Sequence, residues 1–396
     1  MSNIVSITDD IYWIGVNDRS TELFEAIWPL PSGVSYNSYL IEDDKVAVID
    51  TVKNTHIDSY LLNIKDLLGE REVDYLIINH IEPDHSGAIK AFKEAYPEIT
   101  IVGNKKTIGL LEGFYKIVDN VKIIGDGDHL ELGEHKLNFH LTPMVHWPET
   151  MMTYDSKDKI LFSGDAFGGF GTLDGGIFDD EVNIEFYEDE IRRYFSNIIG
   201  KYTPMVQRAI SKLDGLDIEV VASTHGPIWR DNPQRIIDDY SRWSKQDTEE
   251  GVVIVYGSMY GNTEKLVESV ARNISKEGIK NIRVYNISTT HVSYIINDIW
   301  KYEGLILASC SYNTGIFPPM DYLLRILENK NLKNHSLGII GSYSWSGGAL
   351  SRLEDFAAKS GCDFIDPAIE MKCSPDNDDF DDAKLLAKNI AEKLKE

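Results

Sequence analysis

The stretch Tyr75-Leu-Ile-Ile-Asn-His80-Ile-Glu82-Pro-Asp84-His85-Ser-Gly87 is the most informative part of this 396-residue chain. It begins as a buried strand and continues into a loop that carries two imidazoles and two carboxylates within six residues. Functional side chains gather at strand ends in α/β proteins, and Pro83 and Gly87 supply the turns that let such a loop curl. The loop therefore predicts a metal site, and a solvated polar loop is the alternative.

Three further candidate ligands each follow an apolar run: His146 in Met144-Val-His146-Trp147, Asp165 in Phe162-Ser-Gly164-Asp165, and His225 in Ser223-Thr-His225-Gly226. With the loop they form one set of four imidazoles and three carboxylates: His80, Glu82, Asp84, His85, His146, Asp165 and His225. Seven ligands are too many for a single tetrahedral zinc, so the set favours two ions bridged by a carboxylate. Asp165, the isolated acid, is the expected bridge. A set without thiolate suits iron or manganese as well as zinc.

The other histidines of the first half, His56, His129, His135 and His140, are interpreted as surface or packed residues because they have no partner spacing. Short strand-like runs and two helical patterns predict a mixed sheet with covering helices. The runs cover residues 11–16, 38–41, 46–49, 75–78, 136–141, 160–162 and 219–222, and the helical patterns cover 57–68 and 88–95.

The chain changes character after the polar stretch Ser244 to Glu250, so we place a domain boundary between residues 249 and 250. Beyond it, strands alternate with amphipathic helices, which predicts a doubly wound parallel sheet. The expected strands are 252–256, 282–286, 304–308 and 336–340, and the expected helices are 264–275, 322–328, 349–360 and 382–395.

The first strand-to-helix turn of this second half is rich in hydroxyl groups and is placed to hold an anion. Its candidate binding residues are Ser258, Met259, Tyr260, Gly261, Asn262 and Thr263. Side-chain hydroxyls and backbone N–H groups at a helix N-terminus wrap a phosphate without a basic residue. The turn matches neither the dinucleotide nor the nucleoside triphosphate motif. It resembles the phosphate loop of flavodoxins, which bind FMN.

Two more loops follow predicted strands and fall at the crevice of such a sheet. Their candidate FMN-binding residues are Ser309, Ser311, Tyr312, Asn313, Thr314 and Gly315 in the first loop, and Ser342, Tyr343, Ser344, Trp345, Ser346 and Gly347 in the second. The aromatic rings of Tyr312, Tyr343 and Trp345 are candidates to flank an isoalloxazine, and packing at the rim of the pocket is the alternative for each. Cys310 adjoins the pocket and is interpreted as structural.

Composition excludes several classes of function. A net charge of −25 repels phosphate backbones and anionic lipid, so nucleic acid and membrane surfaces are unsuitable partners. The sequence has no run of about 18 apolar residues and no signal-like N-terminus, so a cytoplasmic location is expected. The 3 cysteines form no paired C-x-x-C motif, which excludes a rubredoxin-type iron centre within the chain. If the chain handles electrons, an outside donor must deliver them.

The ligand spacing resembles the metallo-β-lactamase signature H-x-H-x-D-H, except that Glu82 replaces its second histidine. Because of that substitution and its flavodoxin-like half, the chain resembles the flavodiiron proteins. The resemblance implies a metallo-β-lactamase-like αββα sandwich over residues 1–249 and a flavodoxin-like domain over residues 250–396. It also implies that His80, Glu82 and His146 bind one iron, that Asp84, His85 and His225 bind the other, and that Asp165 bridges them. Tyr194 is then a candidate proton or hydrogen-bond donor.

The resemblance further implies a reductase in which FMN passes electrons to two irons that reduce O2 to water or NO to nitrous oxide. A rubredoxin is the implied donor, or reduced coenzyme F420 if the source is a methanogen, and the implied assembly is a head-to-tail homodimer or a dimer of dimers. Two alternatives are a zinc hydrolase of the metallo-β-lactamase superfamily with an accessory flavodoxin domain, and an electron-transfer protein whose first half has lost its metals.

Overall fold

The structure, a computed structural model, describes residues 4–396. The chain divides into two compact units, the first ending at Ser244 and the second beginning at Lys245. The predicted domain boundary at 249/250 falls within strand β17 (Glu249–Gly257) and stays a prediction. No helix among the described residues is long and apolar enough to cross a membrane.

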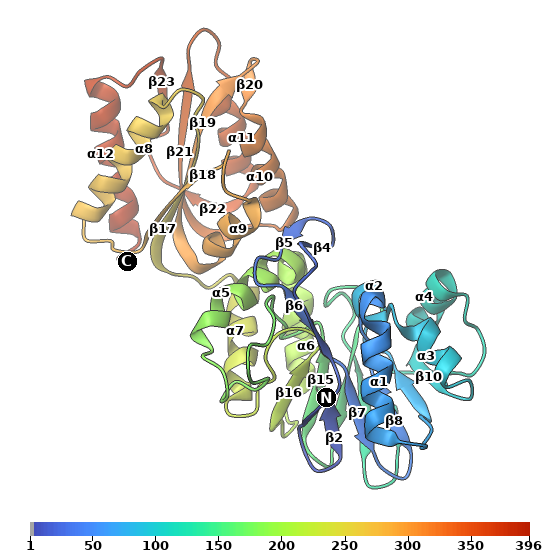
Figure 1. Cartoon of the computed structure of the whole chain (residues 1–396). Coiled ribbons are helices and arrows are strands. Elements are labelled where there is room, and N and C mark those ends of the chain that lie inside the picture. Colours follow the sequence, from blue (N-terminus) through green and yellow to red (C-terminus); the bar gives the residue numbers. More distant parts are fainter. Residues whose placement is uncertain (1–3) are drawn as a thin grey trace. The chain divides into compact units, whose positions relative to one another are not determined.

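The first unit contains two mixed sheets that pack face to face (Figure 1). The strands of the larger sheet lie in the order β1 (Val5–Ser6), β2 (Ile11–Trp13), β7 (Tyr39–Glu42), β8 (Val46–Ile49), β9 (Tyr75–Ile77), β10 (Thr100–Asn104) and β11 (Val121–Ile124). The smaller sheet has the order β12 (His129–Glu131), β13 (Lys136–Leu141), β14 (Met151–Asp155), β15 (Ile160–Gly164) and β16 (Val220–Ser223). Two small antiparallel sheets pair β3 (Val16–Asp18) with β6 (Val34–Tyr36), and β4 (Leu23–Phe24) with β5 (Trp28–Pro29).

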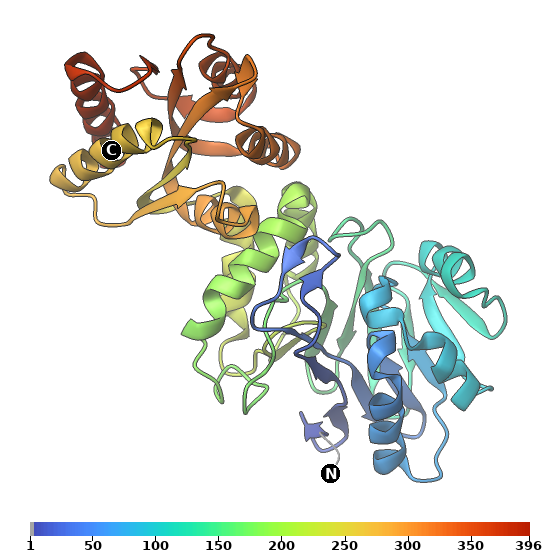
Figure 2. The same ribbon diagram turned by 45° about the horizontal axis from the view of Figure 1, so that its top comes forward.

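Helices cover the outer faces of both sheets, which gives the predicted αββα sandwich. Figure 2 shows α1 (Ile57–Leu68), α3 (Ile89–Ala95) and α4 (Lys105–Tyr115) beside the larger sheet, with α5 (Glu185–Tyr194), α6 (Thr203–Leu213) and α7 (Pro233–Lys245) beside the smaller one. One apolar cluster joins the sheets, with Ile49 and Ile77 from the larger and Phe139 and Phe162 from the smaller. Burying apolar faces against each other is the main stabilising contribution of this arrangement.

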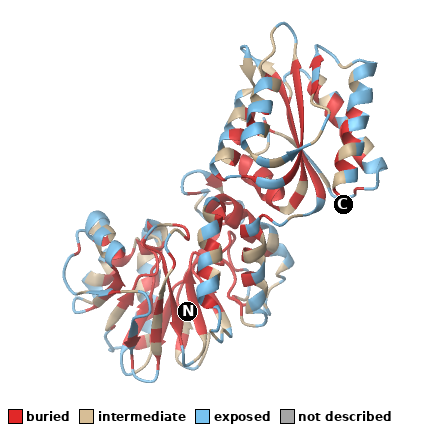
Figure 3. Cartoon of the chain, turned by 180° about the vertical axis from the view of Figure 1, so that it is seen from behind, coloured by how far each residue is buried: buried red, intermediate tan, exposed pale blue. Residues whose placement is uncertain are grey.

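The second unit is a doubly wound parallel sheet, as the alternation of strands and helices predicted. Its strands lie in the order β18 (Ile282–Asn286), β17, β19 (Tyr302–Tyr312), β21 (Lys333–Tyr343) and β22 (Gly361–Phe364), and β23 (Ile369–Lys372) also pairs with β21. Helices α8 (Asn262–Lys276) and α12 (Asn377–Lys393) cover one face, and α9 (Val292–Lys301), α10 (Pro318–Asn329) and α11 (Ala349–Lys359) cover the other. Figure 3 shows that burial is concentrated in the strands and on the helix faces that meet them.

Local sequence explains where individual elements begin and end. On α1 the buried Tyr60, Ile64 and Leu68 recur at four-residue steps, and the helix stops at Gly69, whose φ of 61° suits glycine. The strand predicted over residues 11–16 is interrupted, since β2 ends at Trp13 and β3 begins at Val16; between them, a Cβ at Gly15 would lie only 2.4 Å from the Tyr36 carbonyl oxygen. Residues 309–312, predicted as loop, extend β19, since β20 (Gly315–Ile316) pairs antiparallel with its end.

Candidate functional site

All seven predicted metal ligands lie together at one edge of the first unit. His80 and Glu82 follow β9, and Asp84 and His85 lie on the four-residue helix α2 (Pro83–Ser86). The other three come from loops that follow β13, β15 and β16: His146, Asp165 and His225. Five of the seven are less than 6% exposed. Segments that lie far apart in the sequence of this unit therefore converge on one buried cluster.

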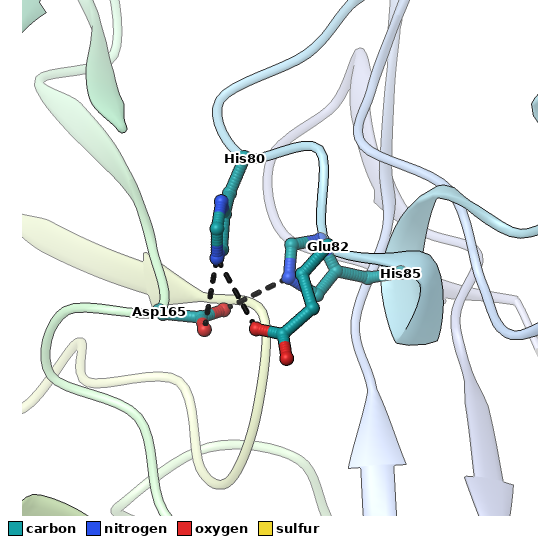
Figure 4. A group of neighbouring side chains, drawn as sticks. All are labelled: His80, Glu82, His85 and Asp165. Carbon is teal, nitrogen blue, oxygen red and sulfur yellow. Dashed lines mark hydrogen bonds and ion pairs between the residues drawn. The ribbon is translucent and has the colours of Figure 1, made fainter. Parts of the chain in front are cut away.

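Asp165 stands at the centre of the cluster, and its two oxygens face different histidines: Figure 4 shows one toward His80 and the other toward His85. Its Oδ2 lies 3.1 Å from His146 Nε2 and 3.7 Å from His80 Nε2. Its Oδ1 lies 3.1 Å from His85 Nε2 and 3.6 Å from His225 Nε2. One carboxylate thus faces two separate groups of imidazoles.

The remaining two carboxylates each join one of these groups. Glu82 Oε2 lies 3.0 Å from His146 Nε2 and 3.3 Å from His80 Nε2. Asp84 lies on the other side, with Oδ1 3.5 Å from His85 Nε2 and Oδ2 3.3 Å from His225 Nε2. We call the first group, His80, Glu82 and His146, the Glu82 half-site. We call the second group, Asp84, His85 and His225, the Asp84 half-site.

The donor atoms fit metal ions because the protein itself leaves several of them unsatisfied. Both oxygens of Asp84, both ring nitrogens of His85 and Nε2 of His225 are buried without a hydrogen-bond partner. Burying polar atoms without partners is costly, and ions placed between these side chains would satisfy the Asp84 oxygens and the Nε2 atoms of His85 and His225. Carboxylates and neutral imidazoles are suitable ligands for iron and related ions. The cluster can therefore hold two ions with Asp165 between them.

Electrostatics favour a cation at the same place. Burial disfavours the charged form of His146, but its hydrogen bonds to Asp165 and Glu82 prevail and raise its pKa to about 9. Burial likewise opposes the charge on His85, and the negative Asp84 and Asp165 raise its pKa to about 9. Protons therefore occupy the imidazoles when no metal is present, and metal binding must displace them.

Several residues that the sequence did not single out support the ligands. Glu149 Oε1 lies 2.6 Å from His80 Nδ1, and the Ser35 carbonyl oxygen lies 2.8 Å from His225 Nδ1. Thr224 donates a 2.6 Å hydrogen bond to Asp165 Oδ1. Asp50 is buried and accepts hydrogen bonds from the N–H groups of Asn79 and His80, and burial raises its pKa to about 6. Among 64 acidic residues nothing local marked Glu149 except its position three residues after His146.

Two more side chains reach the cluster from outside the ligand set. Tyr194 is fully buried at the end of α5, its ring centroid lies 5.7 Å from that of His225, and its hydroxyl has no hydrogen-bond partner. Burial, with the negative Asp165 as a second cause, raises the pKa of Tyr194 well above its usual value. Glu25, in the turn between β4 and β5, has a carboxylate oxygen within 4.8 Å of ligand atoms of Glu82 and His146. Glu25 was not among the site residues predicted from the sequence.

The histidines set aside by the sequence analysis lie outside this cluster. His135 is fully buried, and its ring nitrogens lie 3.0 Å from Asp155 Oδ2 and 3.1 Å from Asp10 Oδ2. Burial opposes the charged form of His135, yet these aspartates raise its pKa above the usual value. Lys157 also donates to Asp10 at 2.5 Å, so a cation already occupies this group.

The second unit carries a cavity of 190 Å³ at the carboxyl ends of β17, β19 and β21. Nine predicted FMN-binding residues line it: Ser258, Met259, Tyr260, Asn262, Thr263, Ser311, Ser342, Tyr343 and Ser344. Two cysteines that were not predicted as binding residues, Cys310 and Cys373, also line it. The other predicted residues are absent from the lining: Gly261, Ser309, Tyr312, Asn313, Thr314, Gly315, Trp345, Ser346 and Gly347.

The cavity fits the phosphate-bearing end of a flavin. Gly261, with φ of 85°, turns the chain into α8 and leaves backbone N–H groups at a helix N-terminus, where an anion is favoured. Thr263 Oγ1 and Ser342 Oγ lie 2.9 Å apart and add hydroxyls to the same place. A pocket for a drug-sized ligand is usually about 300–1,000 Å³, so this cavity would hold only part of an FMN molecule. The exposed rings of Tyr260 and Trp345 are suitable neighbours for it.

Comparison with known proteins agrees with both units. Residues 34–226 match the family described as ODP family beta lactamase, and residues 254–395 match the flavodoxin family. The anaerobic nitric oxide reductase flavorubredoxin of Salmonella typhi is 30% identical over 393 residues, which cover 98% of this chain and 82% of that protein.

Solved structures agree over nearly the whole chain. Rubredoxin oxygen:oxidoreductase from Desulfovibrio gigas is 29% identical, with a TM-score of 0.95 and coverage of 99% of both chains. A flavo di-iron protein from Thermotoga maritima is 28% identical, with a TM-score of 0.91 and coverage of 99% of this chain and 98% of that one.

Proposed function

Because this chain belongs to the flavodiiron proteins, a family of oxidoreductases, we propose that it carries electrons from an external donor through FMN to a diiron site that reduces O2 to water or NO to nitrous oxide. The observation that carries the proposal is the division of the buried ligands about Asp165. Each oxygen of this carboxylate faces one half-site, which is what two ions bridged by one carboxylate require.

In this proposal the Glu82 half-site holds one iron, the Asp84 half-site holds the other, and Asp165 bridges them. The residues that line the 190 Å³ cavity hold FMN, with the turn before α8 at its phosphate. When bound, FMN exchanges electrons singly or in pairs, and the two irons take up a diatomic substrate. The folded chain supplies the positioning, the protons and the exclusion of water.

Aromatic side chains form the wall beside the Asp84 half-site. The ring centroid of Phe24 lies 5.5 Å from that of His225, and Phe170 packs against Phe24 at 5.3 Å. Both rings are at most 3% exposed, so they exclude bulk water from this side of the cluster. The Tyr194 hydroxyl lies within this wall without a protein partner, and we assign it as a hydrogen-bond or proton donor to the bound substrate.

The donor, the assembly and the location follow from the relatives as further parts of the proposal. The name of the Desulfovibrio gigas protein includes rubredoxin, and we propose a rubredoxin as the electron donor, with reduced coenzyme F420 as the alternative. We also propose a cytoplasmic enzyme that works as a head-to-tail homodimer or a dimer of such dimers.

To test this proposal, the protein is reduced under anaerobic conditions before either gas is added. The iron- and FMN-loaded protein is reduced through a rubredoxin, and consumption of O2 and of NO is recorded in matched electrode runs. We expect consumption of at least one gas, which is lost in Asp165→Asn although its flavin is still reduced. Asp155→Asn, which changes a buried carboxylate outside the cluster, is the matched control and keeps its activity. If neither gas is consumed while the flavin is reduced, the reductase proposal is wrong.

A second variant tests the ligand that separates the reductase from a hydrolase. Glu82→His supplies the neutral imidazole found in the metallo-β-lactamase signature. We expect this variant to lose reductase activity and still to bind zinc when zinc is supplied. Full reductase activity in Glu82→His would contradict the assignment of Glu82 as an iron ligand.

A further inference from the structure

The ligand histidines differ in what supports the ring nitrogen that faces away from the cluster. Behind His80 lies a buried carboxylate, with Glu149 Oε1 2.6 Å from Nδ1. Behind His225 lies only a neutral group, the Ser35 carbonyl oxygen, 2.8 Å from Nδ1. Nδ1 of His85 is buried and has no partner at all. The Glu82 half-site therefore has a charged support that the Asp84 half-site lacks.

The contact with Glu149 fixes the form of the His80 ring. A carboxylate accepts, so Nδ1 of His80 carries a hydrogen and donates it, and Nε2 is the ring nitrogen left to bind a metal once its own proton is displaced. Nε2 faces Glu82 Oε2 at 3.3 Å and Asp165 Oδ2 at 3.7 Å. The same Glu149 oxygen also accepts from the Ile81 N–H at 3.2 Å, which holds the carboxylate in place. His80 is thus oriented and polarised before any metal binds.

Glu149 contributes a buried negative charge to the Glu82 half-site. It is 1% exposed, and its second oxygen, Oε2, is buried without a hydrogen-bond partner. Apart from the shared Asp165, the carboxylates of Glu82, Glu149 and Glu25 lie near the Glu82 half-site, and those of Asp84 and Asp50 lie near the Asp84 half-site. A carboxylate behind a ligand histidine raises the basicity of the ring, and its loss typically lowers metal affinity about 10–100-fold.

We infer that Glu149 is a positioning residue that makes the two metal sites unequal, so that the Glu82 half-site binds its ion more tightly and fills first. This inference rests on the proposed diiron function. It goes beyond that function because the bridging geometry alone would allow two equivalent sites. The more negative half-site also favours the ion of higher charge.

The test is a titration of the metal-free protein with Co²⁺ in the presence of a competing chelator. The visible absorption of the bound ion monitors each step of binding. We expect two steps in the native chain. Glu149→Gln keeps the shape and an acceptor oxygen but removes the charge, and it should weaken only the first step, by about 10–100-fold. Glu190→Gln is the matched control, because it removes a partly buried glutamate that pairs with Arg193 and should leave both steps unchanged.

A second variant identifies the tighter site without relying on Glu149. His85→Ala removes a ligand of the Asp84 half-site, and it should abolish the weaker step while the tighter step remains. Loss of the tighter step in His85→Ala, equal affinities in the native chain, or equal weakening of both steps in Glu149→Gln would each overturn the inference. If the native chain binds no Co²⁺, the proposed metal centre itself fails, and the inference fails with it.

Discussion

Replacing Tyr194 by phenylalanine should raise the stability of the metal-free protein and lower the activity of the loaded enzyme. The Tyr194 side chain is fully buried, and its hydroxyl has no hydrogen-bond partner. An unsatisfied buried polar group costs about 1–3 kcal/mol, so Tyr194→Phe should stabilise the first unit by up to that amount. Tyr240 is the matched control, because it is equally buried and its hydroxyl donates to the Gly168 carbonyl at 3.0 Å. Tyr240→Phe should therefore cost about 0.5–1.5 kcal/mol.

Both effects are measurable in the full chain. Hydrogen exchange of the amides in β14 and β15 reports the opening free energy of the first unit alone. Turnover of the loaded Tyr194→Phe enzyme should fall about 10²–10⁴-fold if the hydroxyl donates to the substrate. Because the pKa of Tyr194 is raised well above its usual value, this contribution should persist at alkaline pH. Equal destabilisation by both substitutions would refute the claim that the hydroxyl lacks a partner, and unchanged turnover would refute its role as a donor.

Three further predictions follow from the same structure. FMN should slow the alkylation of Cys373, which lines the cavity, and leave that of Cys362 unchanged, as peptide mass spectrometry of the two thiols would reveal. Folding raises the pKa of His135, so the protonated ring stabilises the fold fully below the unfolded-state pKa of about 6.5. That stabilisation is lost as the pH rises through the higher pKa of the folded state. His135→Gln should therefore lower the melting temperature most on the acidic side. Gly169→Ala places a Cβ 2.6 Å from Ile191 Cγ1 and should lower the free energy of unfolding, measured in urea, by about 1–3 kcal/mol. An unchanged free energy of unfolding would show that α5 can shift to make room.

The parts of the fold that the sequence predicted are those with a regular burial pattern. Strand β13 alternates between buried Leu137 and Phe139 and less buried neighbours, and both of its ends match the prediction. Helix α9 was missed although its apolar residues recur at helical steps; eight of its ten residues are buried, including the polar Ser293, Asn297 and Asp298, so burial there does not follow the apolar pattern. The end of β19 was missed for a different reason, because its hairpin with β20 begins at residues that also suit a loop.

The candidate site was predictable where its ligands follow strands and unpredictable where they meet across the fold. The loop from His80 to His85 brings four ligands together within one segment. Glu149 instead meets His80 from 69 positions away, and Ser35 supports His225 through a backbone carbonyl that any residue type would provide. Tyr194 is fully buried within a charged helix, and its place beside His225 results from packing between segments far apart in the sequence. Contacts of this kind depend on tertiary packing, which local pattern does not encode.

The same long-range contacts predict how the protein responds to loss of its metals. His80 and His225 are oriented by partners 69 and 190 positions away, so the ligands are held by the folded sheets rather than gathered by the ions. Chelation should therefore leave the first unit folded and lower only its stability, by about 2.7 kcal/mol for a site whose free metal had been 100 times its dissociation constant. Calorimetry with and without a chelator would measure this shift, and circular dichroism would confirm the retained fold. Unfolding on chelation would instead mean that the ions, and not Glu149 and Ser35, hold the histidines in place.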